Sequence, residues 1–182
     1  MATVISGDTG VSQVQNNIVS PAKLTQPLTL GTAQNTTSGT SIDFTGIPSW
    51  AKRITVTFNG VSTNGASLVL VQLGAGSITT SGYFSGTTTG NAAYVTTVPS
   101  AAGHVLSSLG LSSYGYYGSC VFTKISENIW SSTSVVRIAS DGTTSMGASG
   151  VTLSGTLDRI RITTVNGTDT FDAGYVNILY EG

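Results

Sequence analysis

Apolar and polar residues alternate along several stretches of the chain after residue 40, which predicts β-strands. In R-I-T-V-T-F-N, Ile54, Val56 and Phe58 alternate with polar residues, and D-R-I-R-I-T-T places Ile160 and Ile162 in the same way. Successive side chains of a strand point to opposite faces of a sheet, so this pattern is typical of strands with one buried and one solvated face. The runs S-L-V-L-V-Q-L and V-N-I-L-Y are closer to continuously apolar, which predicts strands covered on both faces, with another subunit as one candidate cover.

Turn-forming dipeptides separate or follow these stretches, and they agree with an all-β fold. Asn59-Gly60, Asn64-Gly65, Asp141-Gly142 and Asn166-Gly167 accept positive φ. Convincing helical periodicity is absent after residue 30. We therefore predict an antiparallel β-sandwich of jelly-roll type, with about eight strands, over residues 36–182.

The first 35 residues differ from the rest. Val11, Val14 and Ile18 are spaced by three and four, which predicts one short helical stripe, and Leu24 follows it without an obvious partner nearby. We predict that residues 1–35 form an arm for oligomerisation or for attachment to a larger particle. The alternative is a terminus without fixed structure. The candidate oligomerisation residues are Val11, Val14, Ile18 and Leu24.

Residues 77–118 are rich in Gly, Ser and Tyr and interrupt the strand pattern, which predicts long loops. Such loops usually carry function. Aromatic rings beside small hydroxyl residues suit sugars, because the ring covers the apolar C–H face of the sugar. We predict a saccharide or protein receptor site here. The alternative is that the rings pack against neighbouring loops or subunits. The candidates are Tyr83, Tyr114, Tyr116, Tyr117 and Trp130, with Phe84 next to the first of them.

Composition narrows the class of partner. Only 8% of the 182 residues are charged and the formal net charge is -1, whereas the chain holds 25 Ser and 29 Thr. Without a Lys/Arg cluster, we expect neither nucleic acid nor an anionic membrane as partner. The N-terminus has no basic start and no long apolar run, so we expect no signal peptide, no membrane insertion, and synthesis in a cytoplasm.

Few residues can support catalysis or hold a metal. The sole histidine, His104, can in principle pair with Ser100 or Ser107, but no G-x-S-x-G motif frames a serine, so we interpret it as a loop histidine. Cys120 is the only cysteine and reads as a small buried hydrophobe. We expect no metal, no cofactor and no enzymatic activity. A pair of carboxylates built between subunits stays open as the alternative.

Three stretches of the chain carry a family resemblance. Two are T-S-I-D-F-T-G-I-P-S-W-A-K-R-I-T-V-T-F-N-G-V-S-T-N-G at 40–65 and L-S-G-T-L-D-R-I-R-I-T-T-V-N-G-T-D-T-F-D-A-G-Y-V-N-I-L-Y-E-G at 153–182, and the third is the opening G-D-T-G-V-S-Q-V-Q-N-N-I-V-S-P-A-K-L. They resemble a module at the C-terminal end of tailed-bacteriophage fibre proteins, together with its lead-in. The resemblance implies a β-sandwich that forms a homotrimer on a phage tail or fibre, often at the receptor-contacting end, and it carries over no catalytic residues.

These observations lead to an expected function. We expect a non-catalytic virion protein of the tail or fibre, a host-adhesion module that contacts bacterial surface polysaccharide or an outer-surface protein and joins other tail or virion proteins. A capsid or tail decoration protein without a receptor role is the second expectation. A polysaccharide depolymerase is the third.

Overall fold

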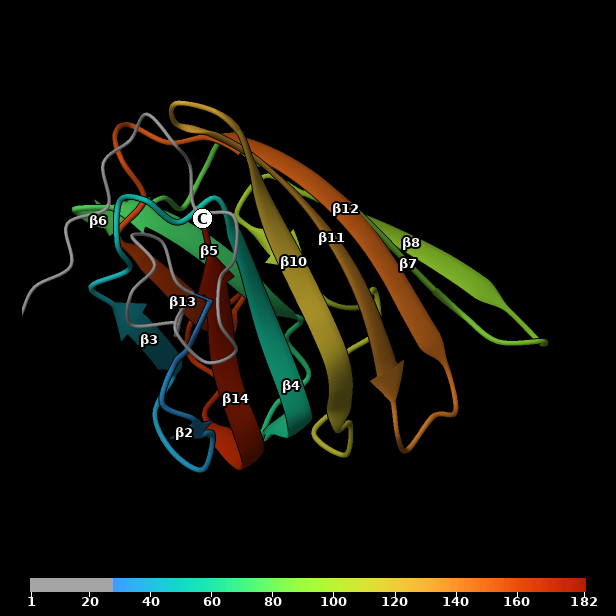
Figure 1. Ribbon diagram of the computed structural model, residues 1–182. Coiled ribbons are helices and arrows are strands. Elements are labelled where there is room, and N and C mark those ends of the chain that lie inside the picture. Colours follow the sequence, from blue (N-terminus) through green and yellow to red (C-terminus); the bar gives the residue numbers. More distant parts are fainter. Residues whose placement is uncertain (1–27) are drawn as a thin grey trace, which may run out of the picture.

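The computed structural model describes residues 28–182, which form two β-sheets packed face to face (Figure 1). Every pair of neighbouring strands is antiparallel, and this part of the chain contains no helix, so none that could span a membrane. The predicted antiparallel β-sandwich is confirmed. The strands are β1 (Thr29–Leu30), β2 (Gln34–Asn35), β3 (Ser41–Thr45), β4 (Arg53–Thr63), β5 (Val69–Ala75), β6 (Ser77–Ile78), β7 (Phe84–Gly90), β8 (Val95–Ser100), β9 (His104–Val105), β10 (Tyr116–Ser126), β11 (Ile129–Ile138), β12 (Thr144–Thr152), β13 (Arg159–Thr164) and β14 (Phe171–Glu181).

The strand count differs from the expected number of about eight, because four of the fourteen described strands are only two residues long. Two of these, β1 and β2, pair with β14, so residues 29–35 of the predicted arm belong to the sandwich. The predicted helical stripe and the candidate oligomerisation residues Val11, Val14, Ile18 and Leu24 lie outside the described residues.

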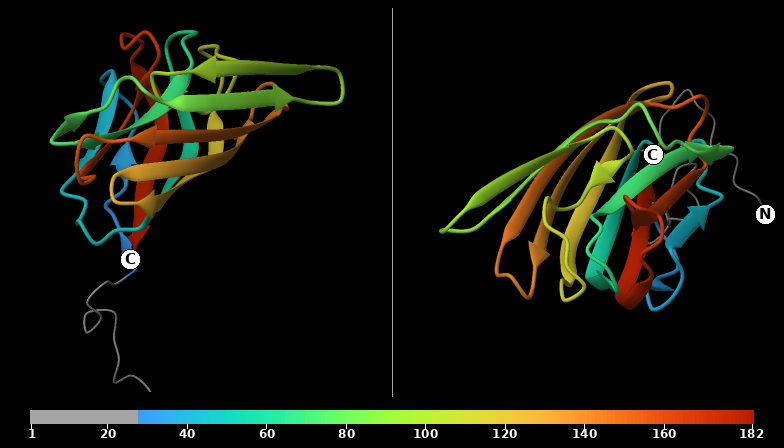
Figure 2. Two further views of the ribbon diagram at one scale, coloured as in Figure 1. Left: turned by 90° about the horizontal axis from the view of Figure 1, so that it is seen from above. Right: turned by 180° about the vertical axis from the view of Figure 1, so that it is seen from behind.

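Sheet A has nine strands in the order β1-β14-β4-β10-β11-β12-β7-β8, with β2 also paired to β14. Its inner face is apolar along β4 and β10, where Ile54, Val56, Cys120 and Phe122 are buried, as the alternating pattern predicts. Sheet B has five strands, β3-β13-β5-β6 with β9 beside β5, and it covers the side of sheet A that contains β14 and β4. The β7–β8 hairpin projects beyond this covered side (Figures 1 and 2).

The apolar run S-L-V-L-V-Q-L forms β5, which is buried on both faces. The second cover comes from the chain itself. The Gln72 amide donates a hydrogen bond to the carbonyl of Ala102 at 2.8 Å, and Gly103 lies against Leu70 and Val71. For β5, the second cover, for which another subunit was one candidate, is therefore supplied by residues 102–103 of the same chain.

The Asn59-Gly60 dipeptide lies inside β4, where it forms a bulge, although the sequence predicted a turn after the strand. The register with β10 shifts here, and Gly60 has φ +67. Gly174 in β14 faces it with φ +96, and a Cβ on Gly174 would lie 2.4 Å from the Gly60 carbonyl carbon. Two irregular strands thus come together where only glycine fits.

Replacing this glycine should destabilise the fold. We expect Gly174→Ala to lower the free energy of unfolding by about 2 kcal/mol or more, because it adds both a backbone clash and positive φ. The matched control is Gly155→Ala, where the nearest atom to the new Cβ lies at 3.7 Å and φ is ordinary. Urea unfolding of both variants checks this; equal stabilities would contradict it.

Candidate functional site

Four of the five aromatic candidates are buried, so the expectation that they present their rings to a receptor is wrong for these four. Tyr83, Tyr114, Tyr116 and Trp130 have exposed fractions of 4%, 8%, 2% and 2%. Only Tyr117, exposed by 43%, has a ring that a partner can reach. The alternative interpretation, packing against other parts of the protein, is the one that the structure supports for the other rings.

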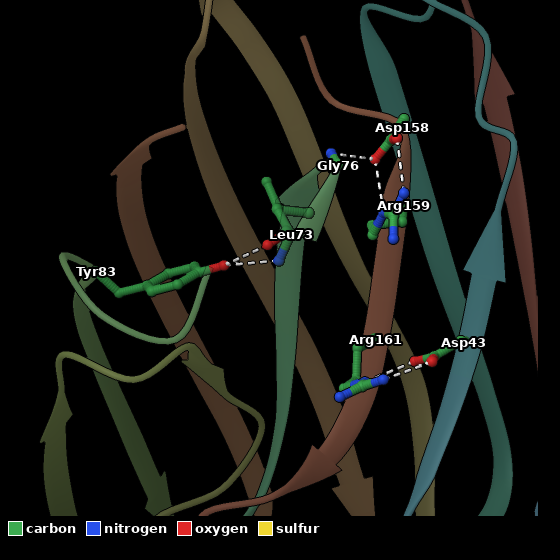
Figure 3. A network of polar contacts seen from close by, with 7 residues as sticks. All are labelled: Asp43, Leu73, Gly76, Tyr83, Asp158, Arg159 and Arg161. Atoms are coloured by element: carbon green, nitrogen blue, oxygen red, sulfur yellow. Dashed lines mark hydrogen bonds and ion pairs between the residues drawn. The ribbon is translucent and has the colours of Figure 1, made fainter. Parts of the chain in front are cut away.

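Tyr83 is a structural anchor for the chain that leads into β7. Its hydroxyl accepts a hydrogen bond from the Leu73 N–H at 2.6 Å and also contacts the Leu73 carbonyl oxygen at 3.4 Å (Figure 3). Burial raises the pKa of Tyr83 to about 12, so the phenol stays protonated. In the same way, the Tyr116 hydroxyl donates to the Leu109 carbonyl at 3.0 Å.

The segment predicted as long loops contains a regular hairpin. Residues 84–100 form β7 and β8, which pair in register from Ser85 opposite Ser100 to Gly90 opposite Val95. The chain then continues through β9 and crosses the inner face of sheet A, where β9 packs against β7 and β12. Strands β7 and β12 turn Ser and Thr side chains toward it.

His104 is fully buried in β9, so its interpretation as a loop histidine is wrong. Both ring nitrogens are hydrogen-bonded, Nδ1 to the Ser132 hydroxyl at 2.7 Å and Nε2 to the Ser134 hydroxyl at 2.8 Å. Ser132 donates onward to Ser149 at 3.1 Å. A Cβ on Gly147 would lie 3.0 Å from His104 Nε2, so this glycine lets β12 pass over the imidazole.

A second group of hydroxyls continues this buried cluster. Thr89 Oγ1 lies 2.6 Å from Ser145 Oγ and 3.1 Å from Ser107 Oγ, and it accepts the Ser108 N–H at 2.9 Å. The Thr87 hydroxyl donates to the Val105 carbonyl. These bonds fasten the segment with β9 to the sheet, in addition to the burial of Val105 and Leu106. The histidine and serine side chains of the cluster are buried, so its geometry is that of a polar core.

The opposite side of these strands is the candidate functional site. By the sheet register, the outer face of sheet A presents apolar side chains to solvent, and we call this surface the contact face. The exposed fraction is 92% for Phe84, 62% for Met146 and 58% for Val135. Large apolar side chains this exposed on neighbouring strands are typical of an interaction surface. The contact face comprises Phe84, Val95, Tyr117, Val135, Met146 and Tyr175, with the Thr, Ser, Gly and Ala residues between them.

The contact face carries few charges. Among the described strand residues that point to this side, the charged ones are Arg137, Asp172 and the ion pair of Arg53 with Glu181, all toward strand ends. Arg137 donates to the Gly142 carbonyl at 2.6 Å. A partner therefore needs no strong opposite charge.

The outer face of sheet B is built differently. Arg161 donates two hydrogen bonds to Asp43, each of 2.7 Å, across β13 and β3 (Figure 3). Arg159 binds Asp158 at 2.8 and 2.9 Å, and this guanidinium lowers the pKa of the Asp158 carboxyl. Ion pairs suit contact with water, whereas exposed Phe, Met and Val suit contact with a partner.

Sequence reasoning missed most of the contact face, although one signal was present. The pair Val135-Val136 lies in a strand, so one of its two apolar side chains must point away from the core. Val136 is buried and Val135 is the outward one. Phe84 was named with Tyr83 and Trp130 as an aromatic residue near the candidate tyrosines, and it is the exposed one of these three.

Comparisons with protein-family models, with curated proteins and with solved structures gave no match. Within residues 28–182, no group of three or more His, Cys, Asp or Glu side chains is placed to hold a metal ion.

The buried imidazole should make the fold sensitive to mild acid. Burial lowers the pKa of His104 from its ordinary 6.5 to about 4, so the unfolded chain takes up a proton at a higher pH than the folded protein does. The stability contributed by the neutral ring is complete above pH 6.5 and is lost as the pH falls toward 4. This amounts to about 3 kcal/mol. Urea unfolding at pH 7.5 and pH 4.5 measures the loss.

The control for this prediction is His104→Gln, which keeps hydrogen-bonding groups but has no proton to gain. Its unfolding free energy should be lower than that of the wild type at pH 7.5 and should change little down to pH 4.5. An equal loss in both proteins would assign the acid sensitivity to other groups.

Proposed function

We propose that this protein is a non-catalytic structural and adhesion module of a bacteriophage particle, a tail-fibre or receptor-binding domain of the virion that touches the bacterial surface. The observation that carries the proposal is the contact face, where Phe84, Met146 and Val135 stand in solvent on a hydroxyl-rich, nearly uncharged sheet. Contiguous exposed apolar groups rimmed by polar ones are typical of interaction sites.

The energetics favour contact through this face. Covering an exposed Val, Met or Phe side chain contributes about 1.5–3 kcal/mol each. The residues lie on β7, β11 and β12, whose backbones are fixed by continuous ladders, so little conformational entropy is lost on binding. The face therefore suits adhesion to a large, uncharged surface.

The phage assignment is supported by where the resembling stretches lie. Residues 40–65 supply β3 and β4, residues 153–182 supply β13 and β14, and in the fold β3 pairs with β13 while β4 pairs with β14. The resemblance thus covers one continuous side of the sandwich. Apart from Tyr175 on β14, the named residues of the contact face lie outside it, an arrangement that suits a common framework with a particular recognition surface.

A capsid or tail decoration protein is the second candidate. Met146 and Val135 are aliphatic neighbours across β11 and β12, and such pairs are common where protein covers protein. A depolymerase finds less support, because Asp43 and Asp158 are both engaged by arginine.

The contact face can be tested by placing charges on it. We expect the double variant Val135→Asp/Met146→Asp to bind at least about tenfold more weakly to intact cells and envelope fractions from a panel of bacteria, the change that ~1.4 kcal/mol produces. Val165→Asp, at a site 53% exposed in the turn before β14, is the control and should bind like the wild type. A wild type that binds no envelope, or a double variant that binds equally well, would contradict the proposal.

We further propose that the protein works as a homotrimer. The support is the resemblance, together with the low charge of the chain, which leaves little repulsion between copies. Sedimentation equilibrium of the full chain at micromolar concentration should give three times the chain mass. A stable monomer would remove the trimer and leave the contact face untouched.

A further inference from the structure

The end of the contact face near the start of β7 has a distinctive shape. Phe84 lies opposite Gly150 of β12, and two residues along β7, Gly86 lies between Ala148 and Pro99. A depression of about 520 Å³ on one side of Phe84 and another of about 330 Å³ on the other are lined in part by these residues. We call the group Phe84, Gly86, Pro99, Ala148 and Gly150 the Phe84 hollow.

The floor of the Phe84 hollow is the bare backbone at Gly86 and Gly150. The fold does not require glycine at either position. A Cβ on Gly86 would meet nothing within 4 Å, and a Cβ on Gly150 would meet only the Trp130 carbonyl oxygen, at 3.9 Å. Neither residue has positive φ, and β7 and β12 pair without a register shift, so no bulge is present. Glycine inside a strand reduces stability, and without a local reason it marks a place where a ligand or another backbone approaches closely.

We propose that the Phe84 hollow binds a neutral saccharide, with a sugar ring lying on the bare backbone at Gly86 and Gly150 and its C–H face against the Phe84 ring. The inference rests on the proposed function and names its receptor class. Phe84 is 92% exposed, so its ring is free to stack. Both depressions fall in the size range of small-ligand sites.

The chemistry around the hollow favours an uncharged sugar. No charged residue lines either depression. Hydroxyls stand at the border, where Thr88 and Thr97 lie 3.0 Å apart on β7 and β8 and can exchange hydrogen bonds with sugar hydroxyls. An anionic sugar would find no cation among these residues.

A protein segment fits this place less well. Extended peptides usually bind a sheet by adding a strand at its edge through main-chain hydrogen bonds. Here the last strand of sheet A is β8, and Pro99 removes a backbone N–H from it. What remains beside Phe84 is a flat floor, which suits the face of a ring.

The direct test is a titration of the ¹⁵N-labelled full chain with maltohexaose and, separately, mannohexaose, followed by NMR. Stacking depends on the C–H face of a sugar ring and not on one particular pattern of hydroxyls. We therefore expect saturable chemical-shift changes of the Gly86 and Gly150 amides with at least one of the two sugars. Phe84→Ala should weaken that binding about tenfold or more. No saturable shift with either sugar, or equal affinity of Phe84→Ala, would overturn the proposal.

The glycines provide a second test that separates binding from folding. Gly86→Thr and Gly150→Thr should leave the urea midpoint unchanged or raise it, because the fold has room for the side chains, and should weaken sugar binding at least tenfold. Ser119→Thr, which adds a methyl group to an outward position on β10, is the control and should bind like the wild type. Should a threonine variant fail to fold, the alanine variants replace it. If folded Gly86→Thr and Gly150→Thr variants bind the sugar as tightly as the wild type does, the proposed site is wrong.

The outcomes also distinguish this inference from the proposed function. Sugar binding at the hollow without adhesion to any bacterial envelope would sustain the saccharide site and remove the adhesion role. Envelope adhesion that survives Phe84→Ala and Gly86→Thr, together with no saturable sugar-induced shift, would keep the adhesion role and remove this site. Envelope adhesion lost in these variants without any sugar-induced shift would assign the hollow to a protein receptor, against the proposal.

Discussion

The structure depends on the difference in size between its two sheets. Sheet A has nine strands and sheet B five, so sheet B can cover only part of the inner face of sheet A. The remaining inner surface, along β11, β12 and β7, is covered by β9, the two-residue strand of sheet B that pairs with β5, and by the residues after it, through hydrogen bonds of serine and threonine hydroxyls and of His104. Backbone ladders and this polar core together hold a wide sheet in one shape, which a binding surface needs if it is to lose little entropy on contact.

The two kinds of interior have different consequences. The apolar core under sheet B tolerates changes of salt and pH, because burial raises the pKa of the Cys120 thiol and of the Tyr83 and Tyr116 phenols, so these side chains stay neutral. The polar core depends on the neutral state of one imidazole and on the hydrogen bonds that the hydroxyls around it make. Since β7 and β12 belong to the polar half, the half that presents Phe84 and Met146 is also the half that acid is expected to loosen first.

The sequence indicated the apolar half well and the polar half poorly, for one physical reason. Strands β4 and β13 bury Val56 and Ile162 between polar neighbours, so their period of two is visible in hydropathy. Strand β7 buries Thr87 and Thr89, so its buried and exposed positions are not distinguished by hydropathy, and the sequence resembles that of a loop. The burial of Tyr114 and the pairing of His104 with β11 arise from contacts distant in sequence, which local patterns do not encode. Phe84 was named only beside the tyrosine candidates, because its glycine neighbours matter only after the register is known.

The central claim is that the contact face is where this protein meets its partner, and side-chain oxidation measures this most directly. Bacterial envelopes that bind the wild-type chain would be mixed with it, exposed to hydroxyl radicals, and the modified residues quantified by mass spectrometry. The account predicts that Phe84 and Met146 become protected on binding, while Val165, away from the contact face, is oxidised as in the free protein. Unchanged oxidation of Phe84 and Met146 in the bound protein, or protection confined to Val165, would contradict it.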